Sequence, residues 1–372
     1  MGHTIAVVTV PTMGVEEEYF LVDPASRAPV PLAERVLKRA TPFLGDSVST
    51  EFSQLQIEVK TRPCADAEAL RGELVRLRAA AMAAAAAEGV RICASGTPVL
   101  APREPWTVAD HPRYRAGVGQ YRAMLDDFAV CAQHTHVHLP NREHAVLTGN
   151  HLRPWLPLLV ALGANSPFHY GKDTGYADWR TVIRSRFPCL GPPPYAESMR
   201  DHDDLAVRMA ESDAMLDAGT PFWDIRPNPR LPTLEVRTMS VGADVDDTVA
   251  CAVLIRALVM TANAKVVAGE TSSRPPGELV RAGCWRAARD GWSGSGVDAL
   301  SGGILPAPVQ TQRLFDFVRP ALEDCGDVAI VADFVDRLRV RGTGAERQRA
   351  SAMRHGVLTG VVDDLIAEAA RT

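Results

Sequence analysis

Three consecutive glutamates lie inside a segment that otherwise reads as a β-strand, and they constrain the fold more than any other feature of the chain. The segment is Gly14-Val15-Glu16-Glu17-Glu18-Tyr19-Phe20-Leu21-Val22-Asp23. Because strand side chains alternate between the faces of a sheet, Glu16 and Glu18 share one face, Glu17 points to the other, and Val15, Tyr19 and Leu21 pack. Two like charges on one face repel, and a divalent cation between them relieves the repulsion. Such an oxygen-rich site suits Mg²⁺ or Mn²⁺ better than Zn²⁺. An exposed acidic patch on an edge strand explains this segment equally well.

The composition narrows the class of protein. With 372 residues, 46% of them hydrophobic, the chain can bury the core of one large domain or two ordinary ones. The formal net charge is only −5 and the Lys and Arg residues are scattered, so we expect no nucleic-acid ligand. No early segment resembles a secretory signal, and polar residues interrupt the longest apolar windows. These features predict no membrane span and a cytoplasmic location.

The number and spacing of the cysteines indicate neither structural disulfides nor a zinc site. They are seven in number and widely spaced, without a Cys-x-x-Cys pair, which argues against both a disulfide scaffold and a zinc knuckle. We interpret all of them as buried thiols: Cys64, Cys93, Cys131, Cys189, Cys251, Cys284 and Cys325.

A second segment, residues 49–59, largely alternates polar with apolar residues and predicts another half-buried strand. Its alternation places Phe52, Gln54, Gln56 and Glu58 on one face and Glu51, Leu55, Ile57 and Val59 on the other. If the face with Glu58 adjoins the face with Glu16 and Glu18, Glu58 supplies a third carboxylate. A solvent-exposed strand face is the alternative.

Three histidines recur at every second residue between residues 130 and 139. On a strand, His134, His136 and His138 share one face. Three histidines in a row are difficult to bury unless they meet a metal, a phosphate or a carboxylate. A zinc hydrolase is a competing interpretation, because paired histidines at this spacing bind zinc in some enzymes. The zinc-hydrolase interpretation does not explain the three consecutive glutamates.

Residues 222–227 and 233–239 predict two antiparallel strands joined by the turn at residues 228–232. Asp224 and Arg226 then share one side, as do Glu235 and Arg237. The hairpin can offer a metal-binding carboxylate next to a guanidinium group that binds anions. Cross-strand salt bridges are the structural alternative.

The rest of the chain reads mainly as helix. We expect a strand near residues 4–10 and another at 90–94, followed by a turn in which Gly96 allows a ligand to approach closely. Loops before residue 180, followed by Arg180, Arg184 and Arg186, are suited to holding a carboxylate or phosphate. The loop at residues 291–303 is rich in Ser and Gly, which suggests a mobile gate. Helices are expected over residues 32–40, 66–88 with Asp66 as N-cap, 112–128, 142–163, a stretch ending near 216, 246–268, 276–289, 308–322, 328–340 and 344–370.

Six motifs, read in order, resemble those of the type 2 glutamate–cysteine ligase family, also called carboxylate-amine ligases. They are Gly14-Val15-Glu16-Glu17-Glu18, Leu55-Gln56-Ile57-Glu58-Val59-Lys60-Thr61, His134-Thr135-His136-Val137, Asn165-Ser166-Pro167-Phe168, Thr174-Gly175-Tyr176-Ala177-Asp178-Trp179-Arg180, and Trp223-Asp224-Ile225-Arg226-Pro227 with Thr233-Leu234-Glu235-Val236-Arg237. The resemblance covers residues 12–270 and fits the short, single-domain form of the family. It therefore implies one domain over residues 1–372, with a motif-bearing core and a helical part at 271–372. The implied fold is α+β: a curved, mostly antiparallel sheet with helices on its outer face, as in the catalytic domain of glutamine synthetase.

The resemblance also implies roles for individual residues. Glu16, Glu18, Glu58, His134 and Glu235 would be metal ligands. Arg237 would stabilise phosphate charge, and Arg180 would bind a substrate carboxylate or phosphate. The implied substrate contacts are Asn165, Ser166, Thr174, Asp224, Arg226 and His136.

The reaction implied by the resemblance is amide formation from a carboxylate and an amine through an acyl phosphate. It uses ATP and Mg²⁺, with Mn²⁺ as a possible substitute, and small-molecule acid and amine substrates. In the prototype, the γ-carboxylate of glutamate joins the amine of cysteine. The alternatives are the same chemistry on another acid or amine in specialised metabolism, a zinc-dependent hydrolase, and a relative that binds nucleotide or a partner without turnover. A homodimer is plausible on general grounds only.

The sequence departs from the pattern of the family at three places. Many relatives carry a histidine after Gly-Thr, where this chain has Thr97-Pro98. His138 stands where others have Gly, and Ser240 stands where Asp is frequent. We expect these positions to lie near the regions that face the substrates, so that they bear on the acceptor amine and the donor acid more than on the phosphoryl chemistry.

Overall fold

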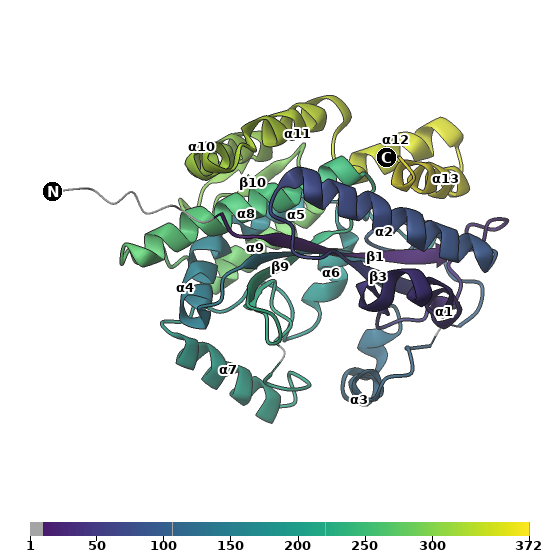
Figure 1. The fold of residues 1–372 in the computed structure, drawn as a ribbon, viewed down its shortest axis with the longest axis horizontal. Helices are drawn as coiled ribbons and strands as arrows, with labels where there is room; N and C mark the ends of the chain where they lie inside the picture. Colours follow the sequence, from purple (N-terminus) through teal and green to yellow (C-terminus); the bar gives the residue numbers. More distant parts are fainter. Residues whose placement is uncertain (1–9, 106, 220, 372) are drawn as a thin grey trace.

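An antiparallel sheet of seven strands forms the centre of the protein (Figure 1). The computed structural model describes residues 10–105, 107–219 and 221–371. The strand order is β2-β3-β1-β5-β9-β8, and β4 pairs with the second half of β1. The strands are β1 (Met13–Val22), β2 (Val48–Thr50), β3 (Gln56–Lys60), β4 (Arg91–Cys93), β5 (Ala132–His138), β8 (Ile225–Pro227) and β9 (Thr233–Ser240). Two short hairpins, β6 (Phe168–His169) with β7 (Lys172–Asp173) and β10 (Ser295–Val297) with β11 (Ile304–Pro306), lie outside this sheet.

Helices pack on one face of the sheet and leave a cavity on the other. In Figure 1, α2 and the C-terminal helices α10 to α13 lie on one side of β1, whereas α3 and α7 lie on the opposite side. Both α2 and α8 contact β1 directly. The helices are α1 (Ala33–Leu44), α2 (Ala67–Ala87), α3 (Pro112–Tyr121), α4 (Arg142–Leu152), α5 (Leu156–Leu162), α6 (Trp179–Ser185), α7 (Met199–Glu211), α8 (Val245–Val267), α9 (Gly277–Asp290), α10 (Ala307–Cys325), α11 (Val328–Arg341), α12 (Gly344–His355) and α13 (Leu358–Ala369). This arrangement confirms the expected antiparallel sheet with helices behind it.

The central strand β1 shows why its two faces differ. Val15, Tyr19 and Leu21 are buried on the face that packs against helices, as their alternation predicts. Glu17 lies on this face too, and its carboxylate is fully buried. Arg78 of α2 donates two hydrogen bonds to it, and the hydroxyls of Tyr19 and Thr248 donate one each. Because a buried carboxylate needs such partners, Glu17 joins β1 to α2 and α8 instead of taking part in the acidic site.

Several predicted elements are divided in the structure. Residues 49–59 do not form one strand, because the chain turns after Thr50 and re-enters the sheet at Gln56. The helix predicted over 142–163 is broken by a 3₁₀ turn at Arg153–Trp155, since Pro154 cannot donate a backbone hydrogen bond. The last predicted helix is two helices, separated by Gly356 in the left-handed conformation. α3 ends at Tyr121, and a 3₁₀ turn follows it. Of the strand predicted over residues 4–10, positions 4–9 lie outside the described residues.

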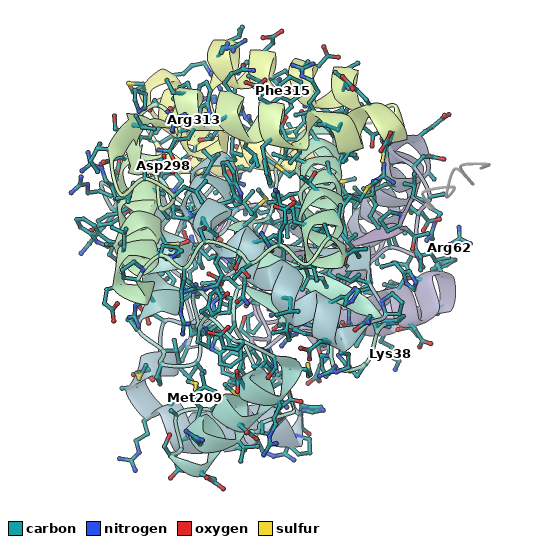
Figure 2. All side chains as sticks on the ribbon, turned by 90° about the vertical axis from the view of Figure 1, so that its left-hand side faces the viewer. Lys38, Arg62, Met209, Asp298, Arg313 and Phe315 are labelled. Carbon is teal, nitrogen blue, oxygen red and sulfur yellow. The ribbon has the colours of Figure 1, made fainter. Side chains whose placement is uncertain are left out.

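The loop predicted to be a mobile gate is a tied hairpin. It contains β10 and leads into β11, and the carboxylate of Asp298 accepts hydrogen bonds from the Leu300 backbone and the Ser301 hydroxyl. Arg313 of α10 forms an ion pair with the same carboxylate at 3.0 Å, and Figure 2 shows the two side chains close together. Residues 291–303 are also missing from the described lining of the cavity, so the gating prediction finds no support.

Helix α8 lies in the interior and packs against helices from both parts of the chain. By length and apolar composition it could cross a membrane, but most of it is buried within the protein. Its side chains share one apolar core with α5, α10 and α11, including Leu156, Val249, Leu314 and Phe334. The motif-bearing part of the chain and the C-terminal helices therefore share a core.

Candidate active site

A cavity of about 590 Å³ opens on the face of the sheet that bears Glu16 and Glu18. Its floor consists of side chains from β1, β3, β5 and β9. Its walls come from α3, α6, the segment at residues 187–190 and the turn between β8 and β9. One wall is aromatic and consists of Tyr114, Phe52, Phe128 and Phe187. In this order, each ring makes an edge-to-face contact with the next. A volume of this size accommodates small-molecule substrates.

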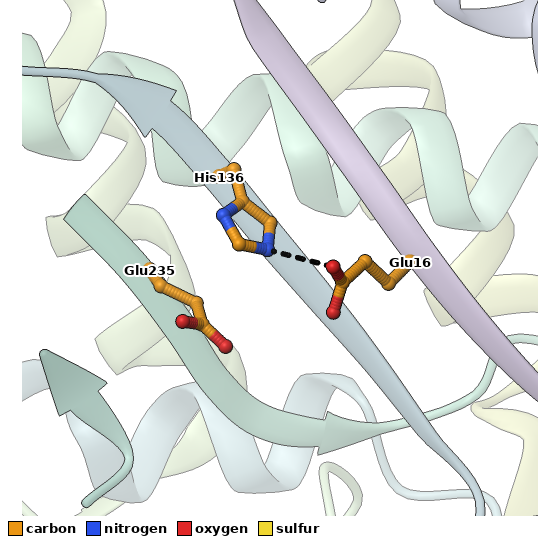
Figure 3. A group of neighbouring side chains, drawn as sticks. All are labelled: Glu16, His136 and Glu235. Atoms are coloured by element: carbon orange, nitrogen blue, oxygen red, sulfur yellow. Dashed lines mark ion pairs between the residues drawn. The ribbon is translucent and has the colours of Figure 1, made fainter. Parts of the chain in front are cut away.

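Carboxylates and histidines on the floor fall into three groups, each of which could hold a metal ion. The groups are Glu16 with His136 and Glu235, Glu16 with Glu58 and His134, and Glu18 with Glu51 and Glu58. Within each group the ligand atoms lie within 4.8 Å of one another. Glu16 and Glu58 each belong to two groups, so the three form one continuous row. Figure 3 shows the first group, which spans β1, β5 and β9.

Strand register explains why these residues meet. Glu18 lies opposite Glu58, Glu16 opposite His134, and His136 opposite Glu235. Side chains directly opposite each other on one face of an antiparallel sheet are about 5 Å apart at Cβ, which is within reach of a shared ion. The face of β1 that bears Glu16 and Glu18 therefore has potential metal ligands beside it on both neighbouring strands, β3 and β5.

Glu18, Glu51 and Glu58 form the group with the strongest mutual repulsion. Burial and the nearby charges of Glu51 and Glu58 raise the pKa of Glu18 well above its usual range. Burial, followed by the charges of Glu16 and Glu51, raises the pKa of Glu58 to about 8. Burial likewise raises the pKa of Glu51. Burial is the largest cause of all three shifts, and the charges of neighbouring carboxylates add to it. An oxygen-donor set of this kind fits Mg²⁺ or Mn²⁺, as the sequence predicted.

Glu16 and the two histidines form a second electrostatic unit. Burial opposes the charge of Glu16, but hydrogen bonds with His134 and His136 outweigh it and hold the pKa of Glu16 well below its usual range. Burial and the charge of Arg237 lower the pKa of His134 to about 3, so this imidazole is neutral near pH 7. Neutral imidazole is the form that binds metals.

The Glu235 carboxylate accepts hydrogen bonds from three neighbouring side chains. Arg226 donates hydrogen bonds to both of its oxygens, at 2.9 and 3.2 Å, and the Asn228 amide donates another at 2.8 Å. Arg237 also forms an ion pair with it. Although burial opposes the charge, the two arginines hold the pKa of Glu235 well below its usual range. Arg226, predicted to contact substrate, therefore lines the cavity chiefly as the residue that holds Glu235.

Arg180 enters the cavity from the first turn of α6. Its guanidinium donates to the backbone carbonyls of Thr238 and Arg237, and its Nε has no hydrogen-bond partner among the described residues. Burial and the neighbouring Arg184 lower its pKa to about 10, so it remains charged at neutral pH. Arg184 also lines the cavity and forms an ion pair with Asp224 at 2.6 Å. Asp224, predicted to contact substrate, is instead the partner of Arg184.

Of the six residues predicted to bind substrate, only Arg226 lies in the described lining of the cavity; Asp224, His136, Asn165, Ser166 and Thr174 do not. The amide of Asn165 donates to the carbonyls of Ala94 and Val241 and accepts from Gln348, so its hydrogen bonds are used inside the protein. Ser166 is fully buried and donates to Asp178. The hydroxyl of Thr174 donates to the carbonyl of Pro167. These three positions shape the loops behind Arg180 and do not face the cavity.

The three departures from the family pattern also lie outside the described lining. Thr97 and Pro98 are buried, and the Thr97 hydroxyl donates to the carbonyl of Phe168. Ser240 donates to Asp178 and packs against Gly96, where a Cβ atom would lie only 2.3 Å from the serine hydroxyl. His138 is exposed at the end of β5. None of these positions lines the cavity, and the space beside Gly96 is taken by Ser240 and not by a ligand.

The sequence interpretation missed several residues of the cavity. Glu51 was placed on the face opposite Glu58, but the turn between β2 and β3 brings it back to Glu18 and Glu58. Lys60 forms an ion pair with Glu58 at 2.7 Å, and its place two residues after Glu58 on the same strand was the available signal. Tyr114 and Arg113 of α3 line the far wall, which no local pattern indicates.

Comparison with known proteins agrees with this architecture. The model of the glutamate–cysteine ligase family 2 matches residues 12–368. A Salinispora tropica protein provisionally named glutamate–cysteine ligase 2 is 44% identical over 346 residues, which cover 93% of this chain and 91% of the relative. A similarly named protein of Nocardia farcinica, designated 2-1, is 41% identical over 354 residues, which cover 95% and 92%.

Solved structures share the fold at much lower identity. The glutamate–cysteine ligase of Francisella tularensis, solved in complex with AMP, matches with a TM-score of 0.73 at 12% identity, covering 98% of this chain and 90% of that one. A bifunctional glutathione synthetase from Pasteurella multocida gives 0.68 at 14% identity, covering 98% and 53%. The α+β fold expected from the sequence, an antiparallel sheet with helices packed behind it, is thereby confirmed. The chain belongs to the glutamate–cysteine ligase family 2 and is a carboxylate-amine ligase of that type.

Proposed function

We propose that the protein joins the γ-carboxylate of glutamate to the amine of cysteine, using ATP and Mg²⁺ and passing through an acyl phosphate. The observation that carries this proposal is the row of potential metal ligands on the sheet, of which five carboxylates and His134 line one cavity with Arg180 and Arg237. A free carboxylate does not condense with an amine near neutral pH, so it must first be activated. The names of the relatives support the choice of glutamate and cysteine.

The atoms balance over two steps. A carboxylate oxygen attacks the γ-phosphorus of ATP, the bond to the β-phosphate oxygen breaks, and ADP leaves. The amine then attacks the acyl carbon, the bond to the phosphate oxygen breaks, and an amide, inorganic phosphate and one proton are formed.

The residues of the cavity divide this work. Glu16, Glu18, Glu51, Glu58, His134, His136 and Glu235 would hold the metal ions. When bound, Mg²⁺ neutralises phosphate charge and orients the phosphates. Arg226 and Asn228 fix Glu235 in place. Arg180 and Arg237 supply positive charge for the transferred phosphoryl group and the substrate carboxylate.

The structure offers less to a zinc hydrolase. His138 is exposed at the end of β5, and the three histidines do not form a group of ligands among the described residues. His134 and His136 fall into different groups, each with one histidine and two carboxylates, and such oxygen-rich donor sets suit Mg²⁺ or Mn²⁺ better than Zn²⁺.

Release of ADP tests the proposal. With Mg²⁺ and ATP, we expect ADP release that requires both glutamate and cysteine, with γ-glutamylcysteine as product. In parallel, Glu18→Gln should reduce the rate about a hundredfold or more while circular dichroism remains unchanged, because one ligand carboxylate is lost. ADP release with another pair of acid and amine would retain the ligase mechanism and exclude the prototype substrates. Absence of ADP release with every pair tested would contradict the proposal.

A further inference from the structure

Among the Lys and Arg residues that line the cavity, one arginine differs from the others in its contacts. Lys60 pairs with Glu58, Arg113 with Asp217, Arg184 with Asp224, and both Arg226 and Arg237 with Glu235. Arg180 donates to two backbone carbonyls. Arg230 also lines the cavity but is exposed, and its side chain makes no ion pair in the part of the chain that the structure describes.

The backbone of Arg230 is held in place, although its side chain has no hydrogen bond or ion pair with the residues that the structure describes. The Asn228 amide oxygen accepts hydrogen bonds from the backbone N–H groups of Arg230 and Leu231, both at 2.9 Å. The amide nitrogen of the same residue donates to Glu235 at 2.8 Å. The turn that carries Arg230 is thus tied to the acidic row, and Asn228 is itself buried. A fixed turn at a cavity mouth presents a charged side chain to a ligand with little loss of backbone entropy.

We propose that Arg230 binds a carboxylate of an amino-acid substrate that does not take part in the reaction. This inference rests on the proposed function. A planar guanidinium with free donors forms two parallel hydrogen bonds with a carboxylate, and such bonds are among the strongest available to a small ligand. Both amino acids of the proposed reaction carry an α-carboxylate that remains unchanged. Arg230 is therefore a specificity residue, whereas Arg180 and Arg237 act at the reacting groups.

Two pairs of substrates that differ by this carboxylate identify its source. On the donor side, 4-aminobutyrate retains the reacting carboxylate of glutamate and lacks the α-carboxylate. On the acceptor side, cysteamine retains the amine and thiol of cysteine and lacks the carboxylate. Steady-state rates are measured for the wild type, Arg230→Ala, Arg230→Lys and Arg200→Ala, in which an exposed arginine of α7 outside the described lining is removed as a control.

We expect the wild type and Arg200→Ala to prefer the carboxylate-bearing member of one pair. Arg230→Ala should reduce that preference in kcat/KM about tenfold or more, through KM and with little change in kcat, because uniform binding is lost. Arg230→Lys should restore part of it, since a point charge without the fork geometry remains. An unchanged preference in both pairs, or a rise in KM for ATP alone, would overturn the inference.

Binding measurements separate this inference from the proposed function. Each of the four compounds is titrated calorimetrically into the wild type and the variants with Mg²⁺ and a non-hydrolysable ATP analogue. Absence of turnover in the wild type would contradict the proposed function. The loss of affinity for glutamate or cysteine in Arg230→Ala, relative to Arg200→Ala, would still support the role of Arg230, and equal affinities would refute it.

Discussion

At the scale of single residues, Glu58 shows how the fold prepares a binding site at the expense of stability. Its pKa is raised from 4.5 to about 8, mainly by burial and then by Glu16 and Glu51. Between pH 4.5 and 8 the folded protein therefore holds a proton that the unfolded chain has released. The free energy of unfolding that Glu58 contributes is fully present below about pH 4.5 and is lost as the pH rises toward 8.

This sign gives a measurable prediction. Without divalent ions, the difference in free energy of unfolding between the wild type and Glu58→Gln should fall as the pH rises from 5 to 8. The slope should not exceed about 1.4 kcal/mol per pH unit, the value for one proton. Urea denaturation at several pH values measures it, and using the difference removes the contribution of other groups such as His134. A difference that is constant or rises with pH would contradict the assignment.

Glu51 provides a second test at this scale. Because it lies with Glu18 and Glu58, we expect Glu51→Gln to weaken Mn²⁺ binding about tenfold to a hundredfold. Electron paramagnetic resonance of free Mn²⁺ measures the affinity without relying on turnover. Glu104→Gln, at an exposed glutamate, is the matched control. Equal affinities in the two variants would exclude Glu51 from the site.

Residues of the site could be predicted from the sequence where the alternation typical of a strand continued without interruption. Glu16 and Glu18 follow from the alternation in β1, and His134 from that in β5. Glu51 was not predictable, because an unrecognised turn at residues 51–55 reverses the phase of the alternation. The family resemblance identified the loop around Asn165, but its hydrogen bonds show a structural role that the motif could not reveal.

At the scale of elements, we expect the stability of the fold to depend strongly on the contact between β1 and α2. Arg78 and Glu17 are both almost fully buried and bonded to each other. Arg78→Met leaves the Glu17 carboxylate buried without its cation, so the protein should lose about 3 to 5 kcal/mol of stability. Chemical denaturation measures the loss. Arg76→Met, in the same helix but largely exposed, should change stability by less than about 1 kcal/mol. Similar losses in both variants would refute the special role of Arg78.

The sequence predicted elements best where the local pattern and the long-range pairing agree. α2 was predicted nearly to the residue, because Asp66 caps its start and accepts a hydrogen bond from the Ala69 backbone. The hairpin of β8 and β9 was also confirmed. The break at Pro154 inside the predicted helix at 142–163 went unrecognised, since the apolar pattern continues across it. The neighbours of each strand in the sheet are set by packing between distant segments, and periodicity carries no information about them.

At the scale of the whole molecule, the C-terminal helices are part of the fold. Arg256 of α8 forms a buried ion pair with Asp327 before α11, and Gln348 of α12 donates to Asn165. The apolar core crosses the same boundary. We therefore expect one cooperative unfolding transition, with coincident curves from far-ultraviolet circular dichroism and tryptophan fluorescence. Two separated transitions would show that residues 271–372 form an independent unit.

The central claim is that the cavity activates a carboxylate by phosphorylating it. The most direct test uses glutamate with ¹⁸O in its γ-carboxylate, together with ATP, Mg²⁺ and cysteine, and analyses the released phosphate by mass spectrometry. If an acyl phosphate forms and the amine displaces phosphate from it, each phosphate released should carry one ¹⁸O from the carboxylate. Phosphate without ¹⁸O would mean that ATP is hydrolysed by water, and the proposed mechanism would be wrong.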